Sequence, residues 1–228
     1  MNFFGHAVVA SWISRDPAYV LGAMLPDLAN MIRSPLPALT DARLREGVHD
    51  HRLVDRIFHD TRTFRKLCAC SFEQLRHLGV DRGRSRAAAH VGIEILLDEV
   101  LARDPTRCQH YAAALEQAAP DELGARMGWL DGDQERFERL RLRLQQRSGV
   151  PDVVTPEVLA YRLDRAFGGR TRLAMGLEDL ELVRKWAPAA RRQVAADADH
   201  LIHELVSGLS HAGTVGGHLT APPSPPGG

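Results

Sequence analysis

The chain has 228 residues, a length that suits one domain of ordinary size or one domain with an added helical part. Hydrophobic residues make up 44% of the chain and charged residues 25%, which is the composition of a protein with a packed core. The formal net charge is zero. This excludes a whole-protein field that would attract nucleic acid, so any recognition of anions must be local.

Cysteine usage and the amino-terminal segment predict the compartment. The cysteines Cys68, Cys70 and Cys108 are odd in number, which argues against a disulfide framework and for a reducing environment. Residues 1–14 contain no basic n-region and are followed by no small-residue cleavage signal, so we expect no signal peptide. No stretch of about 18 apolar residues predicts a membrane span. We therefore expect a cytoplasmic protein.

Almost every segment favours helix, because aromatic residues are only 6% of the chain and period-two alternation is not sustained. The first expected helix covers residues 4–12. Asp16 and Pro17 then form a cap that opens a second helix, which Pro26 should kink or restart. Residues 34–39 contain two prolines and are expected to form a loop.

The middle of the chain predicts a long helix, capped by Thr40 or Asp41 and running to about Lys66. The further expected helices are 72–77, 84–102, one opened by Asp104-Pro105, 134–146, 156–166 and 177–208, the last interrupted near Pro188. The Gly/Pro-rich end predicts a disordered tail over 208–228. We therefore expect an all-α domain over 1–207, made of a metal-site part (1–103) and a helical extension (104–207).

Two of these helices carry histidines and carboxylates at helical spacing. The first stripe is His51, Asp55 and His59, and the second is His90, Glu94 and Asp98. Residues four apart lie on one face of a helix. If the two helices pack together, they direct imidazoles and carboxylates at each other, and such mixed nitrogen and oxygen donors suit a divalent transition metal. A single pair of this kind usually forms a surface hydrogen bond, but two stripes with His6 and Asp27 besides favour a metal site.

The environment of Asp98 supports this interpretation. Asp98 lies in an otherwise apolar part of its helix, between Leu97 and Val100. An unpaired buried carboxylate costs several kcal/mol, on the order estimated for buried charges. A metal ion, or an Arg or His from a neighbouring helix, would provide the partner that Asp98 needs.

Four segments match motifs of one bacterial family. They are 1–6 (MNFFGH, like MNFLAH), 21–27 (LGAMLPD, like GNLLADF), 47–55 (GVHDHRLVD, like GIxxHRxID) and 93–101 (IEILLDEVL, like LDxxxDHFL). On these residues the chain resembles the acyl carrier protein phosphodiesterases, distant relatives of the HD domains. The resemblance covers roughly residues 1–103 and is most specific over 47–55. Glu94 and Glu99 replace the family's Asp and His, and His90 is additional.

The resemblance implies an HD-like helical bundle with additional carboxyl-terminal helices. It also implies an enzyme that hydrolyses a phosphodiester with Mn²⁺ or Mg²⁺ and releases 4′-phosphopantetheine from acyl carrier protein. Zn²⁺ or Fe²⁺ are alternative ions. The candidate metal ligands are His6, Asp27, His49, His51, Asp55, His90, Glu94 and Asp98. The choice between His49 and Asp50, and between Asp98 and Glu99, stays open.

The residue chemistry agrees with hydrolysis. A bound divalent cation lowers the pKa of its water and neutralises phosphoryl oxygens. Arg52 and Asp98 are the candidate catalytic residues, and the planar guanidinium of Arg52 could orient a phosphate. Two alternatives stay open: a phosphoesterase that acts on a nucleotide or a lipid headgroup, and a metal-stabilised binding protein without catalysis.

A basic segment links the two ligand-bearing helices. Its cationic residues are Arg62, Arg65, Lys66, Arg76, Arg82, Arg84 and Arg86, against only Glu73 and Asp81. Charge runs of this kind usually form a solvated face. Because carrier proteins are acidic, the same surface is also a candidate docking site for one.

Overall fold

The computed structural model describes residues 1–146 and 154–213 and is all-α, as predicted. Its helices are α1 (Phe3–Ile13), α2 (Pro17–Met31), α3 (Ala42–Asp60), α4 (Arg62–Leu78), α5 (Arg82–Leu101), α6 (Pro105–Gln117), α7 (Asp133–Gln146), α8 (Pro156–Phe167) and α9 (Leu177–His211). A short 3₁₀ helix, η1 (Leu123–Arg126), precedes α7. The prediction of additional helices after residue 103 is therefore confirmed.

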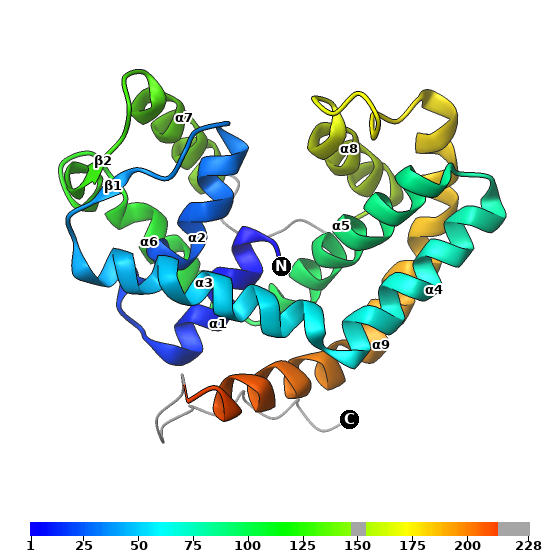
Figure 1. The fold of residues 1–228 in the computed structure, drawn as a ribbon, viewed down its shortest axis with the longest axis horizontal. Coiled ribbons are helices and arrows are strands. Elements are labelled where there is room, and N and C mark those ends of the chain that lie inside the picture. The colour runs from blue at the N-terminus through cyan, green and yellow to red at the C-terminus, as the bar shows by residue number, and fades with distance from the viewer. Residues whose placement is uncertain (147–153, 214–228) are drawn as a thin grey trace.

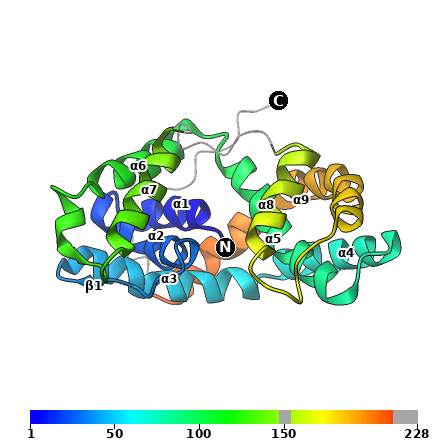
Figure 2. The same cartoon turned by 90° about the horizontal axis from the view of Figure 1, so that it is seen from above.

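The helices form two groups that meet at the centre of the molecule (Figure 1). One group contains α1, α2, α3, α6 and α7, and the other contains α4, α5, α8 and α9. The view from above shows the same grouping, with the amino terminus between the groups (Figure 2). Helix α9 packs along α4, α5 and α8 and then reaches α3, so it connects the two groups.

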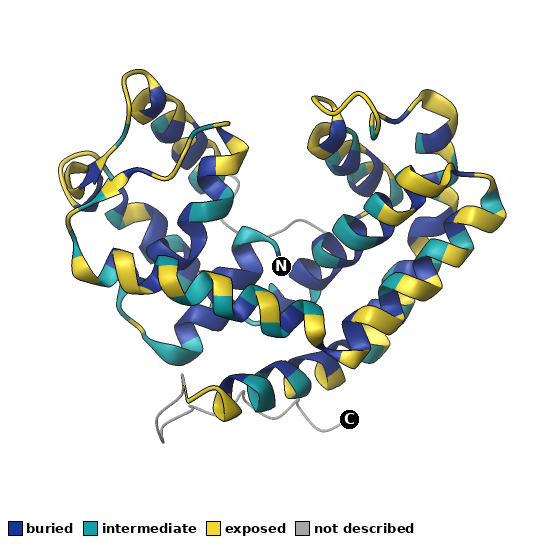
Figure 3. Ribbon diagram, in the orientation of Figure 1, coloured by how far each residue is buried: buried dark blue, intermediate teal, exposed yellow. Residues whose placement is uncertain are grey.

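One continuous hydrophobic core runs through both groups (Figure 3). Its largest fully buried side chains include Phe4 and Phe58 from the first hundred residues and Tyr111, Phe167 and Trp186 from the rest of the chain. The expected extension over 104–207 therefore does not stand apart from the 1–103 part. Its helices α8 and α9 bury the apolar faces of α4 and α5.

Helices α2 and α3 approach each other closely because glycines lie at their contact. A Cβ atom on Gly47 would lie 2.7 Å from the backbone nitrogen of Ala23, and one on Gly22 would overlap the carbonyl oxygen of Leu44. Real Cβ atoms essentially never come nearer than 3.0 Å. These two glycines therefore set the distance between the helix that carries Asp27 and the helix that carries His51.

The long helix expected from 41 to 66 is wrong, because the chain bends at Thr61. This residue has an extended backbone (ψ 140°), its hydroxyl donates to the carbonyl of Phe58 at 2.8 Å, and it accepts from the amide of Phe64 at 3.3 Å. Thr61 thus ends α3 and caps α4. The expected short helix 72–77 is the second half of α4, which ends at Gly79 in the left-handed conformation.

Two prolines that were expected to interrupt helices do not. Pro26 lies inside α2 and Pro188 inside α9, and both helices continue past them. Each proline removes one backbone donor, but buried neighbours such as Leu25, Leu28 and Trp186 hold the helices against the core. Tertiary packing therefore outweighs the local preference.

The chain end and one loop also differ from expectation. Residues 208–211, expected to begin the tail, belong to α9, since Leu209 is buried. The rest of the expected tail, from 214 onwards, lies outside the described residues.

The expected loop 34–39 contains β1 (Ala38–Leu39), which pairs antiparallel with β2 (Met127–Gly128). Among the described residues, no helix has the length and apolarity needed to cross a membrane.

The glycine contact generates a stability prediction. Gly47→Ala should lower the melting temperature by several degrees, because overpacking against backbone costs ~1–3 kcal/mol and each kcal/mol shifts Tm by ~2–4 °C at this size. Gly83→Ala is the matched control: its Cβ would lie 3.3 Å from the exposed carboxylate of Asp81, the cap of α5, which would need to shift by only a few tenths of an ångström. The control should melt at or slightly above the wild-type temperature, because alanine favours helix over glycine by ~1 kcal/mol. Equal melting of both variants by thermal circular dichroism would contradict the proposed close approach.

Candidate metal centre

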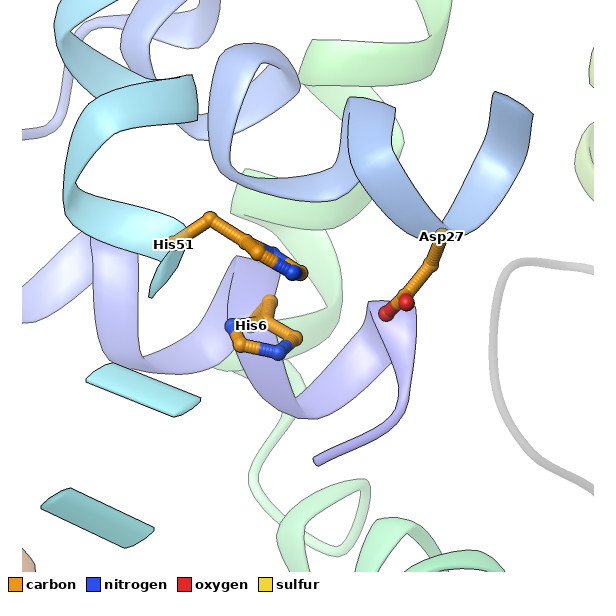
Figure 4. A group of neighbouring side chains, drawn as sticks. All are labelled: His6, Asp27 and His51. Atoms are coloured by element: carbon orange, nitrogen blue, oxygen red, sulfur yellow. The ribbon is translucent and has the colours of Figure 1, made fainter. Parts of the chain in front are cut away.

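Three helices bring His6, Asp27 and His51 together, and we call this group the first triad. Each residue offers a ligand atom that lies within 4.8 Å of those of the other two. Figure 4 shows the carboxylate of Asp27 directed from α2 toward the imidazoles of His6 on α1 and His51 on α3. The two imidazoles stack, with ring centroids 3.8 Å apart.

A backbone contact orients His51 as a metal ligand. Its Nδ1 atom lies 2.8 Å from the carbonyl oxygen of Ala23. Because a carbonyl can only accept, Nδ1 carries the hydrogen and Nε2 keeps its lone pair. Histidines that ligate metals usually donate their other ring N–H to a carbonyl or carboxylate in the same way.

The other two members of the first triad have unpaired buried atoms. His6 is only 1% exposed, and neither of its ring nitrogens has a hydrogen-bond partner among the described residues. The Oδ2 atom of Asp27 is likewise buried without a partner there. Leaving such atoms unpaired costs ~1–3 kcal/mol each. A divalent cation would coordinate one ring nitrogen of His6 and the Oδ2 atom of Asp27, so the residues present fit a metal ion.

Burial also sets the protonation of this triad. It lowers the pKa of His6 to about 3, which keeps the imidazole neutral, the form that binds a metal. It raises the pKa of Asp27 to about 7, because an isolated buried carboxylate is disfavoured. A bound cation would reverse this effect on Asp27 and hold its carboxylate ionised.

Asp55 lies at the border of the first triad. Its Oδ1 atom lies 3.5 Å from Nε2 of His6 and 2.8 Å from the α-amino group of Met1. Burial raises the pKa of this carboxyl, but the neighbouring imidazoles of His59 and His6 and the amino group of Met1 hold it well below its usual range. Asp55 is therefore an ionised carboxylate beside the triad.

Beyond Asp55 a second triad contains His59, His90 and Glu94. The Oε1 atom of Glu94 lies 3.1 Å from Nε2 of His59, 3.2 Å from Nε2 of His90 and 3.0 Å from the amino group of Met1. Burial lowers the pKa of His59, but hydrogen bonds to Asp55 and Glu94 raise it to about 9. His59 belongs to the first stripe but was missing from the expected ligands, and its spacing of four residues from Asp55 is the signal that places it here.

Two expected residues of α3 lie away from both triads. The side chain of His49 is 83% exposed, and its Nδ1 atom lies 3.0 Å from Oδ1 of Asp50. Asp50 also accepts a hydrogen bond of 2.6 Å from the hydroxyl of Tyr19. Neither member of the His49/Asp50 pair therefore joins the metal centre. Arg52 is exposed and makes no ion pair with the described residues.

The other open pair, Asp98 and Glu99, also belongs to neither triad. Asp98 is buried and accepts a hydrogen bond of 2.7 Å from the side-chain amide of Asn2, which precedes α1. Glu99 accepts hydrogen bonds from Arg191 of α9, two of them at 3.0 Å. The candidate ligand Asp98 therefore does not join Asp27 and His51, although its Oδ1 atom is buried without a hydrogen-bond partner among the described residues.

Comparisons with known proteins identify no relative. No protein-family model matches the chain, and no curated protein or solved structure matches it. The resemblance to the acyl carrier protein phosphodiesterases, and with it the HD-like kinship, therefore stays a prediction.

The position of Asp98 generates a pH prediction. Burial raises its pKa to about 8, despite the opposing hydrogen bond from Asn2, whereas the unfolded value is about 3.9. Between these values the unfolded chain releases a proton that the folded protein keeps, so the contribution of Asp98 to stability falls as pH rises. Asp98→Asn stays neutral. Its Tm relative to wild type should therefore rise by several degrees between about pH 5 and about pH 8. A Tm difference that stays constant over this range would contradict the assignment.

Proposed function

We propose that this protein is a metal-dependent phosphodiester hydrolase whose metal ion binds at the first triad. The observation that carries the proposal is the set of buried ligand atoms on His6 and Asp27 that lack hydrogen-bond partners among the described residues. They lie next to His51, whose Nδ1 atom is held by the carbonyl of Ala23. Buried polar groups nearly always have partners, and a bound ion would provide one here. The motif resemblance supplies the reaction class.

The side chains of the site have distinct roles in this proposal. His6, Asp27 and His51 hold the ion, which when bound supplies an activated water and neutralises phosphoryl oxygens. Asp55 remains ionised beside His6 and can accept a hydrogen bond from a water molecule at the site. Arg52 follows His51 in α3, and its exposed guanidinium suits a phosphate oxygen of the substrate.

The three donor groups of the first triad limit which divalent ions can bind there. Two imidazoles and one carboxylate favour Mn²⁺, Zn²⁺ or Fe²⁺ over Mg²⁺, which prefers oxygen ligands and retains several waters. The resemblance favours Mn²⁺ among these. We therefore propose Mn²⁺ as the first ion to test.

The proposal predicts metal-dependent turnover. With added Mn²⁺ the protein should hydrolyse bis(4-nitrophenyl) phosphate, and EDTA should abolish the reaction. His51→Ala should lower kcat/KM by at least ~100-fold, since outer-sphere changes alone cost 10–100-fold. His49→Ala is the matched control, because it removes an exposed histidine from the same helix two residues away. It should retain wild-type turnover.

The same proteins test whether the site binds metal without catalysis. Mn²⁺ should raise the Tm of wild type and His49→Ala by mass action but leave that of His51→Ala unchanged. A stabilised protein without turnover of any diester would replace the hydrolase with a binding protein. Indifference of Tm and turnover to Mn²⁺, Zn²⁺ and EDTA would reject the metal site.

We further propose an acidic carrier protein as the macromolecular substrate, because the segment from α4 into α5 presents free basic residues. Arg62, Arg82 and Arg86 are exposed and make no ion pair with other described residues. In contrast, Arg65 pairs with Asp60, Lys66 with Asp197 and Arg84 with Asp179. The available charge is therefore smaller than the sequence alone suggests.

Charge reversal tests this substrate. Arg62→Glu, Arg82→Glu and Arg86→Glu together should lower kcat/KM for phosphopantetheinylated acyl carrier protein, and raising the salt should produce a similar loss in wild type. Turnover of the small diester should change little. Equal losses on both substrates would show that these arginines serve the site or the fold. If the triple variant turned over the carrier protein as fast as wild type does, the proposed docking surface would be rejected.

A further inference from the structure

The second triad has the features of an independent metal site, and we propose that His59, His90 and Glu94 bind a Zn²⁺ ion of their own. This inference goes beyond the proposed function, because it depends on the geometry of the second triad and not on hydrolysis at the first. The two groups share no ligand, and Asp55 lies between them.

The spacing of the three donor atoms fits one ion. The two Nε2 atoms lie 3.1 Å apart, and their distances to Oε1 of Glu94 are 3.1 and 3.2 Å. Ligands that are ~2.0–2.1 Å from a tetrahedral Zn²⁺ are separated by about 3.3 Å. The donors therefore form a nearly equilateral triangle of the size that one zinc ion requires.

The imidazoles are already oriented for binding. Nδ1 of His59 lies 2.8 Å from the backbone carbonyl of Asp55 and 3.3 Å from its carboxylate, so Nδ1 donates and Nε2 points into the triad. The rings of His59 and His90 stack at 4.8 Å, and Phe64 contacts both with its ring at steep angles. Packing thus restricts ring rotation and holds both donors in place.

The local charge also favours a cation. Asp55 and Glu94 face the single ammonium of Met1, and the side chain of Glu94 is only 11% exposed. Against this one ammonium the two carboxylates leave a negative charge in a largely buried place, which either a proton on His59 or a bound cation must compensate. A proton shared by His59 and His90 competes with zinc for this place, and metal counting distinguishes the two.

A pocket provides access to the site. An open cavity of about 360 Å³ is lined by His59, Phe64, Arg65, Cys68 and His90. Zinc held by three protein ligands commonly keeps a fourth position for water or an exogenous ligand. Because both imidazoles border the cavity, it offers an entry path for the ion and space for that fourth ligand.

Metal counting on the purified full chain tests the proposal. After equilibration with Zn²⁺ and removal of free ion, elemental analysis of wild type should find two ions per chain. His90→Ala should retain one, and its weaker affinity should appear in zinc titrations as a loss of at least ~100-fold at one site. His77→Ala, which removes an exposed histidine from α4, is the matched control and should keep both ions.

Glu94→Gln provides a second variant, since it keeps the side-chain size while removing the anionic ligand. Co²⁺ replaces Zn²⁺ in this experiment, and the visible absorption of tetrahedral Co²⁺ should lose one component in both His90→Ala and Glu94→Gln. Circular dichroism checks that the variants fold. Because His90 is 44% exposed, its replacement should leave the fold intact.

The outcomes separate this inference from the proposed function. One ion that is lost in His51→Ala but kept in His90→Ala would overturn the second site alone. One ion that is lost in His90→Ala but kept in His51→Ala would support the second site and reject the first. Unchanged stoichiometry in all variants, or no bound zinc, would overturn the inference and leave the proton as the occupant of the second triad.

Discussion

The close approach of α2 and α3 determines the geometry of the rest of the centre. Gly22 and Gly47 allow the two backbones to touch, and this contact places Asp27 and His51 opposite the same point. Helix α1 then stacks the ring of His6 on that of His51, beside Asp27. A side chain at either glycine would separate the helices, and the ligand atoms of the first triad would no longer lie within reach of one ion. The packing of the core and the chemistry of the site thus depend on one contact.

Helical spacing predicted which residues face the metal centre, but not which of them belong to the first triad and which to the second. Four residues advance an α-helix by about 40° beyond one turn and ~6 Å along its axis. Over eight residues the stripe therefore turns by about 80° and rises ~12 Å. This explains why His51 and His59 belong to different triads with Asp55 between them. It also explains why Asp98 leaves the face that His90 and Glu94 share and contacts Asn2 instead.

Other features could not be predicted because they depend on long-range packing. Two local hydrogen bonds hold the bend at Thr61, and a long-range one from the amide of Thr63 to the carboxylate of Glu204 fixes the start of α4 against α9. The continuity of α9 through Pro188 likewise depends on the burial of Trp186 and Ala187. Helix type and order were predictable from caps and periodicity, whereas the sharing of one core by both halves of the chain was not.

The central claim is that a metal ion binds among His6, Asp27 and His51. Anomalous diffraction from crystals grown with Mn²⁺ or Zn²⁺ tests it most directly. The account predicts an anomalous peak ~2.0–2.3 Å from Nε2 of His51, from a ring nitrogen of His6 and from an Asp27 carboxylate oxygen. A map without a peak at this position, or with ions only at exposed residues such as His49, would contradict the account.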